Sequence, residues 1–209
     1  MSSFFEKRSY INLDLTFRCA LECPRCLRSY YKNKNLKVPG EDLSLDILEK
    51  ITDHYTTMVF CGQVSDPIFH PKFIDILKMI YRKNKRASVH TAASQKSMNW
   101  YIEAFKANPN ARWTFGIDGL PEESCMYRIN QDGEKLYKVM LESKKHLKTK
   151  PVWQYIPFSY NENNVEEAKA MAARDGITFL LNISSRWAPD RYDPFEPKNP
   201  NLKLGRIYD

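Results

Sequence analysis

The chain has 209 residues, 43% hydrophobic and 13% aromatic, which is enough for one globular domain with a sizeable core. Its net charge of +7 comes from scattered lysines and arginines, and the densest runs, 82–86 and 144–150, fall at expected helix C-termini, so solvated helix ends are favoured over a nucleic-acid surface. No membrane-length apolar stretch or signal segment is visible, and the five cysteines are an odd number, so we expect a cytoplasmic protein in a reducing compartment.

Apolar and polar residues alternate over 10–15, which predicts a first strand, and a cysteine-rich loop follows it directly. Helical periodicity predicts helices over 44–55, with Ser44 as N-cap, and from Pro71 onward. The remaining expected strands are 58–60, 87–91, 113–117, 152–158 and 177–181, and the remaining expected helices are 98–107, 133–147 and 165–173.

Alternating strands and helices are typical of a parallel sheet with right-handed crossovers. A closed eight-unit barrel typically takes about 250 residues, so six units fit this chain better. The sequence therefore predicts an α/β fold: an open partial TIM barrel, (βα)6-like, with mainly parallel strands. We expect the core domain to span 1–184. The proline-rich tail, 185–209, is expected to pack on or cap the barrel as irregular coil.

Three cysteines, Cys19, Cys23 and Cys26, lie within eight residues after the first strand. Structural zinc sites normally use four ligands, whereas three thiolates can hold an iron–sulfur cluster with one iron left open. The spacing therefore predicts a metal centre. The alternative is a zinc site completed by Cys61 or His70, in a protein that uses the metal for structure and not for catalysis.

The loops at the carboxyl ends of parallel strands meet at one face, which is where sites of such folds lie. Besides the cysteines, this rule places there the residues 61–67, 91–94 and 118–120. A basic and tyrosine-rich stretch, 28–37, also follows the cysteines. We read it as a solvated loop, with grip on an anionic or aromatic partner as the alternative.

With these motifs the sequence resembles the radical S-adenosylmethionine (radical SAM) superfamily over most of its length. The Cys-x3-Cys-x2-Cys pattern is the hallmark of that superfamily, and the version with Pro24 and Arg28 resembles the subgroup that often carries SPASM or Twitch extensions. No further cysteine cluster follows, so we expect no auxiliary clusters. The resemblance implies that Cys19, Cys23 and Cys26 hold a [4Fe–4S] cluster.

The resemblance also implies S-adenosylmethionine (SAM) contacts. The stretch with Ser65 and Asp66 resembles the Gly-Gly-Glu-Pro motif, Thr91 begins a loop similar to Thr-Asn-Gly-Ser, and Asp118 lies in a stretch similar to Phe-Ser-Ile-Asp-Gly-Leu. Arg128 is a candidate for the SAM carboxylate, and Arg25 stands where an aromatic residue usually packs by the adenine. The alternatives are an N-terminal helix cap for Asp66, a turn residue for Asp118 and a solvated surface side chain for Arg128.

By resemblance, the chain is an oxygen-sensitive enzyme that cleaves SAM reductively to a 5′-deoxyadenosyl radical, which then abstracts hydrogen from a substrate. The implied partners are SAM, an electron donor such as flavodoxin or ferredoxin, and a substrate that we expect to be a peptide or protein, or anionic. A nucleotide, nucleic acid or sugar is the alternative substrate. No catalytic residue is identified.

Overall fold

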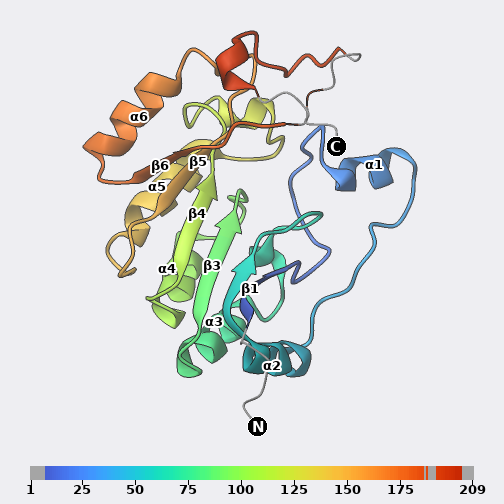
Figure 1. The fold of residues 1–209 in the computed structure, drawn as a ribbon, viewed down its shortest axis with the longest axis vertical. Coiled ribbons are helices and arrows are strands. Elements are labelled where there is room, and N and C mark those ends of the chain that lie inside the picture. Colours follow the sequence, from blue (N-terminus) through green and yellow to red (C-terminus); the bar gives the residue numbers. More distant parts are fainter. Residues whose placement is uncertain (1–7, 186, 188–191, 204–209) are drawn as a thin grey trace.

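The computed structural model describes residues 8–185, 187 and 192–203, and in these the six strands form one parallel sheet (Figure 1). The strands are β1 (Arg8–Leu13), β2 (Tyr55–Phe60), β3 (Arg86–Thr91), β4 (Arg112–Gly116), β5 (Val152–Tyr155) and β6 (Thr178–Leu181). The helices are α1 (Leu27–Asn33), α2 (Leu45–His54), α3 (Phe73–Arg82), α4 (Met98–Ala107), α5 (Gly133–Ser143) and α6 (Val165–Arg174). Three short 3-10 helices are η1 (Pro67–Phe69), η2 (Ser124–Met126) and η3 (Pro200–Leu202).

Each strand pairs in parallel with the next strand along the chain, so the sheet order is β1-β2-β3-β4-β5-β6. β1 and β6 are therefore the two edges of an open sheet. This architecture confirms the predicted open (βα)6 fold. The predicted N-cap is also confirmed, because the Ser44 hydroxyl accepts a hydrogen bond from the Ile47 backbone nitrogen.

Several predicted boundaries were wrong by a few residues. β1 ends at Leu13 and β5 at Tyr155, because the chain turns into site loops there, and α3 begins at Phe73 and not at Pro71. The reading of 28–37 as a loop was also wrong, since α1 occupies most of it. α1 has no side-chain N-cap and buries no residue, so it carries no apolar stripe for a sequence pattern to detect.

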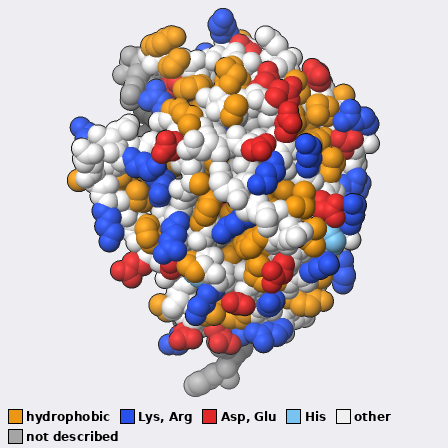
Figure 2. Space-filling view, turned by 180° about the vertical axis from the view of Figure 1, so that it is seen from behind, with side chains coloured by type: hydrophobic (Ala, Val, Ile, Leu, Met, Phe, Trp, Pro, Cys, Tyr) orange, Lys and Arg blue, Asp and Glu red, His pale blue; other side chains and the backbone are white. Residues whose placement is uncertain are grey.

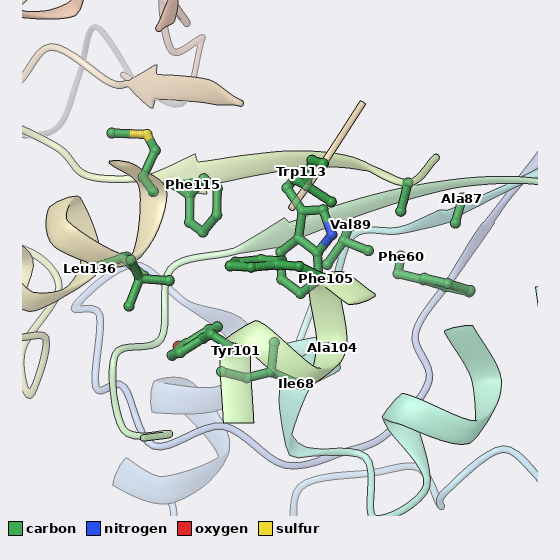
Figure 3. Close-up of a cluster of buried hydrophobic side chains, with 14 of the residues drawn as sticks. Phe60, Ile68, Ala87, Val89, Tyr101, Ala104, Phe105, Trp113, Phe115 and Leu136 are labelled. Atoms are coloured by element: carbon green, nitrogen blue, oxygen red, sulfur yellow. The ribbon is translucent and has the colours of Figure 1, made fainter. Parts of the chain in front are cut away.

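An aromatic core joins the sheet to the helices packed on it. Figure 3 shows Phe105 of α4 between the helix and the strands, close to Trp113 and Phe115 of β4. The Phe105 and Trp113 rings meet edge to face at 4.9 Å between centroids, a favoured aromatic geometry. All three side chains are fully buried, so the helix is fixed against the strands whose carboxyl ends carry the site loops.

Charged side chains of both signs are interspersed over the face drawn in Figure 2, with no extended field of one sign. This agrees with the scattered distribution of lysine and arginine in the sequence. Among the described residues, no helix has the length and apolar character needed to cross a membrane.

The described part of the proline-rich segment, 192–203, is irregular apart from η3. The rest of the predicted tail, residues 186, 188–191 and 204–209, lies outside the described residues. In Figure 1 this C-terminal segment and α1 both lie at the end of the sheet towards which the strand arrows point. The domain boundary near residue 184 stays a prediction.

Candidate functional site

A cavity of about 450 Å³ opens at the carboxyl ends of the strands, within the size range of small-molecule sites. The predicted site residues that line it are Cys19, Cys23, Cys26, Arg25, Ser65, Asp66, Thr91 and Arg128. Asp118 is the one predicted site residue outside that lining, and it pairs with a lining residue. Sequence positions more than 100 residues apart thus meet in one hollow.

The three cysteines are free and partly buried at the cavity wall. The backbone nitrogen of Leu21 donates to Cys19 Sγ at 3.4 Å. Burial raises the pKa of Cys19 to about 12, with a smaller contribution from Asp66, and burial likewise raises the pKa of Cys23. Arg28 acts to lower the pKa of Cys19 and Arg128 that of Cys23, but burial outweighs both, so these two thiols become ligands when a metal replaces their protons.

Of the two residues offered to complete a zinc site, Cys61 lines the same cavity as the three cysteines, and His70 does not. Within the described ranges, no group of three histidine, cysteine or acidic side chains is placed to hold one ion. The His70 ring is engaged at both nitrogens: Nε2 lies 3.0 Å from the Leu43 carbonyl oxygen, and Nδ1 accepts from the Lys72 backbone nitrogen at 3.1 Å. A cluster spreads its thiolates over several irons, so three thiols around one cavity suit it.

The first half of the cysteine loop (residues 19–26) is held by a turn that follows η2. Glu22 donates its backbone nitrogen to the Ile129 carbonyl at 3.1 Å, and the Asn130 side chain donates to the Ala20 carbonyl at 3.2 Å. Asn130 has a φ of 72°, a left-handed conformation that asparagine tolerates better than most residues. The loop is therefore anchored by residues over 100 positions away.

Asp14, directly after β1, anchors the loop that follows β2. Its carboxylate accepts from the Gln63 backbone nitrogen at 2.9 Å and from the Ser65 hydroxyl at 2.6 Å. A Cβ on Gly62 would lie 2.0 Å from the Ser65 carbonyl oxygen, so the turn has room only for glycine. Sequence reasoning missed Asp14, whose only signal was an acidic residue at the end of a predicted strand.

Asp66 ties the loops after β2 and β3 together from a fully buried position. Its carboxylate accepts from the Thr91 hydroxyl at 2.9 Å and from the backbone nitrogens of Ala92 and Ala93 at 2.8 and 3.1 Å. It also caps η1 through the Ile68 backbone nitrogen, so the capping alternative is correct for η1 and not for α3. Burial raises the Asp66 pKa, and these hydrogen bonds oppose the shift. Contacts of Asp66 and Thr91 with SAM stay predictions.

Asp118 and Arg128 form a buried ion pair behind the cavity wall, with Arg128 Nε 2.8 Å from Asp118 Oδ2. Asp118 Oδ1 accepts from the Ile156 backbone nitrogen at 3.0 Å. The side chains are 0% and 16% exposed, so the alternative of a solvated surface arginine was wrong. Burial works to lower the pKa of Arg128, but the Asp118 carboxylate opposes it and the net shift is upward, so the pair stays ionised.

The inner face of the sheet adds a polar floor made of His90, Thr114 and Gln154, which sequence reasoning missed. Thr114 is only 4% exposed. Among the described residues, neither the Thr114 hydroxyl nor the side-chain amide of Gln154 has a hydrogen-bond partner. His90 Nε2 lies 3.2 Å from the Ser88 hydroxyl, and burial lowers its pKa, so the imidazole is neutral at pH 7. The floor thus offers uncharged hydrogen-bonding groups to the cavity. Its members occupy ordinary inward strand positions, which a pattern cannot separate from core.

Two of the four cations in the basic stretch 28–37 contact other residues of the chain. Arg28 donates to the Phe17 carbonyl oxygen, and Lys32 pairs with Glu22 at 2.6 Å. These contacts leave fewer cations for an anionic partner than the sequence indicated.

Solved structures with this fold include two with bound SAM. The chain matches anSMEcpe with bound AdoMet at a TM-score of 0.67 and 15% identity, covering 91% of this chain and 54% of that one. It matches SuiB of Streptococcus suis at 0.71 and 12%, covering 92% and 43%, and SuiB bound to S-adenosylmethionine at 0.60 and 10%, covering 85% and 39%. At this identity the likeness shows the fold.

Sequence comparison adds one curated relative. The chain is 24% identical over 87 residues to the tungsten-containing aldehyde ferredoxin oxidoreductase cofactor-modifying protein of Pyrococcus furiosus. The matched stretch covers 39% of this chain and 23% of that protein. No protein-family model matches the chain. The chain spans about half or less of the length of these solved structures and of the curated relative.

Proposed function

We propose that this chain is a radical SAM enzyme with one [4Fe–4S] cluster bound by Cys19, Cys23 and Cys26. The observation that carries the proposal is the meeting of these three thiols with three strand-end loops around one cavity. The fold shared with two proteins crystallised with SAM supports it. When bound, the cluster and SAM supply reductive cleavage of SAM and a radical that abstracts hydrogen from the substrate.

The protein's own part is to hold and orient these groups in a site shielded from solvent. We assign Ser65, Thr91 and Arg128 to the SAM side, because their loops line the cavity beside the cysteines. Asp66 and Asp118 act there by fixing Thr91 and Arg128 through the bonds described above. Arg25 lines the same wall between two of the cysteines.

The substrate is proposed to lie on the polar floor. A peptide or protein substrate fits best, because a neutral threonine, glutamine and histidine match an amide group that both donates and accepts hydrogen bonds. Both arginines that line the cavity are paired within the chain, Arg128 with Asp118 and Arg25 with Asp193, which weighs against a strongly anionic group at this place. Nucleotide, nucleic acid and sugar substrates are the alternative. A flavodoxin or ferredoxin would supply the electron, and a cytoplasmic location stays a prediction.

The test is anaerobic reconstitution with iron and sulfide, followed by addition of SAM and a strong reductant. We expect a brown protein that absorbs at about 400 nm, as thiolate-ligated iron does. It should form 5′-deoxyadenosine, and Cys23→Ala should form none. Cys125→Ala is the matched control, because Cys125 is exposed and does not line the cavity.

Two other outcomes would each be informative. A four-iron protein that neither binds SAM nor forms the product would mean that the site holds a cluster without the SAM chemistry. A colourless protein that binds zinc and no iron would refute the proposal in favour of a structural metal site.

A further inference from the structure

We propose that Asp193, in the C-terminal segment, is a positioning residue for the cysteine loop, and that it acts through Arg25. The inference rests on the proposed function only in that the loop is taken to hold a [4Fe–4S] cluster. The contact itself is independent of any bound group.

The contact joins two parts of the chain that are 168 positions apart. Arg25 Nε and one terminal nitrogen lie 2.8 and 2.7 Å from the same oxygen of Asp193, Oδ2. The Asp193 side chain is 8% exposed and that of Arg25 30% exposed, so water screens this pair less than a surface pair. Arg25 stands between Cys23 and Cys26, so the ion pair acts on the turn that carries two of the three thiols.

Asp193 is itself held in place. Its second oxygen, Oδ1, accepts from the Phe195 backbone nitrogen at 3.1 Å. The Phe195 carbonyl accepts from the Ser159 backbone nitrogen at 3.0 Å, and the Ser159 hydroxyl donates to the Pro194 carbonyl at 2.6 Å. The carboxylate is therefore presented to Arg25 from a segment fixed to the loop after β5.

Aromatic packing brings the same two parts together. The Tyr127 and Phe158 rings stack at 4.1 Å, and Phe195 packs edge-on against Tyr127 at 5.1 Å. Cys23 and Phe195 both pack against this small aromatic cluster, which also includes Trp187. The C-terminal segment and the cysteine loop thus pack against the same apolar cluster.

The second half of the cysteine loop has few other supports. Its described hydrogen bonds are local: Cys26 donates its backbone nitrogen to the Cys23 carbonyl at 3.0 Å, and the Ser29 hydroxyl donates to that carbonyl at 2.8 Å. The first half is anchored instead to Ile129 and Asn130. Within the described residues, Arg25 to Asp193 is the one hydrogen-bonded contact that ties the Cys23-to-Cys26 turn to a distant segment.

The test is Asp193→Asn, measured first on the metal-free protein. The amide still accepts from Phe195 through one oxygen, but its NH2 group then faces the Arg25 donors, so the ion pair is lost while the turn is kept. We expect amide hydrogen exchange of 23–33 to become about three- to ten-fold faster, the range that corresponds to losing a partly exposed ion pair. Arg25→Gln should give the same effect, and the double variant should add little to it.

The second measurement uses the iron-loaded protein. A chelator should bleach the absorbance at about 400 nm faster in Asp193→Asn than in the native protein, by a similar factor. Asp193→Glu, which keeps the charge, should restore part of the retention. Glu196→Gln is the matched control: it removes the pair with Lys203 at 2.7 Å in the same segment without touching the cysteine loop, so both readouts should stay at the native value.

Unchanged exchange in Asp193→Asn would overturn the inference, and so would an equal change in Glu196→Gln. If exchange is faster but the native protein binds no iron, the positioning contact stands and the proposed function fails. If iron binds and the two readouts of Asp193→Asn match the native protein, the proposed function stands and the positioning role fails.

Discussion

A single buried carboxylate organises two of the site loops. Asp66 accepts hydrogen bonds from one hydroxyl and from backbone nitrogens of both loops while it is fully buried, so it serves the fold whether or not it also meets SAM. A motif comparison assigned it to the cofactor. The structure adds an internal role, which means that loss of SAM binding in an Asp66 variant would not by itself identify a contact.

Asp66→Ala should lower the free energy of unfolding by about 3 kcal/mol, because it leaves the buried Ala92 nitrogen and the Thr91 hydroxyl without their acceptor. Urea denaturation of the metal-free protein measures the change. Glu41→Ala, at an exposed position, should change stability by less than about 0.5 kcal/mol. Equal stability of the native and Asp66→Ala proteins would contradict the structural role.

A second prediction concerns the buried ion pair between Asp118 and Arg128. Asp118→Leu should cost about 3–5 kcal/mol, because it leaves the Arg128 charge buried without a counter-charge. Adding Arg128→Met should recover much of that loss, since two apolar side chains remove the unpaired charge. Urea unfolding of the two single variants and the double variant measures the coupling. Simple addition of the two losses would show that the pair does not act as a unit.

At the scale of elements, α5 and α6 are joined by a polar contact at the end of α6. The Tyr137 hydroxyl of α5 donates to Asp175 at 2.6 Å, and Arg174 pairs with the same carboxylate at 2.9 Å. The Arg174 and Tyr137 hydrogen bonds lower the pKa of Asp175 from 3.8 to about 2. The ionised form is therefore bound more favourably in the folded state than in the unfolded chain.

A lowered carboxyl pKa gives stability that is present above the unfolded value and is lost as pH falls through the folded one. Asp175→Asn should therefore cost about 1 kcal/mol at pH 7, a figure reduced because Arg174 is largely exposed. The difference from the native protein should shrink between pH 4 and pH 2. Urea denaturation across this pH range checks it, and a constant difference would show that packing and not charge is responsible.

The helices and strand ends also show how much of the fold could be predicted from the sequence. The five long helices were predictable because each has an apolar face or a capping residue, as Ser44 has for α2. α1 was missed because seven residues that bury nothing leave no periodic signal. Strand ends were misplaced where loops carry site residues, since backbone nitrogens of these loops donate hydrogen bonds to the carboxylates of Asp14 and Asp118 there.

For the whole molecule, SAM bound in the cavity at the carboxyl ends of the strands should stabilise the folded state. SAM at 100 times its Kd should raise the free energy of unfolding of the iron-loaded protein by about 2.7 kcal/mol, through binding to the folded state alone. Anaerobic thermal melts with and without SAM measure it. Cys23→Ala should lose most of the gain, and an equal gain in that variant would place SAM away from the proposed centre.

The amino-acid sequence by itself determined the order of the strands and of every long helix, the open parallel sheet, and the three thiols with the loops that accompany them. These follow from local periodicity, caps and short spacing, which a linear pattern retains. Only the tertiary structure decided the partners of Arg25, Asp66 and Arg128, and the polar floor of the cavity. Those depend on contacts between segments far apart in the chain, and such contacts exist only after the strands have assembled side by side.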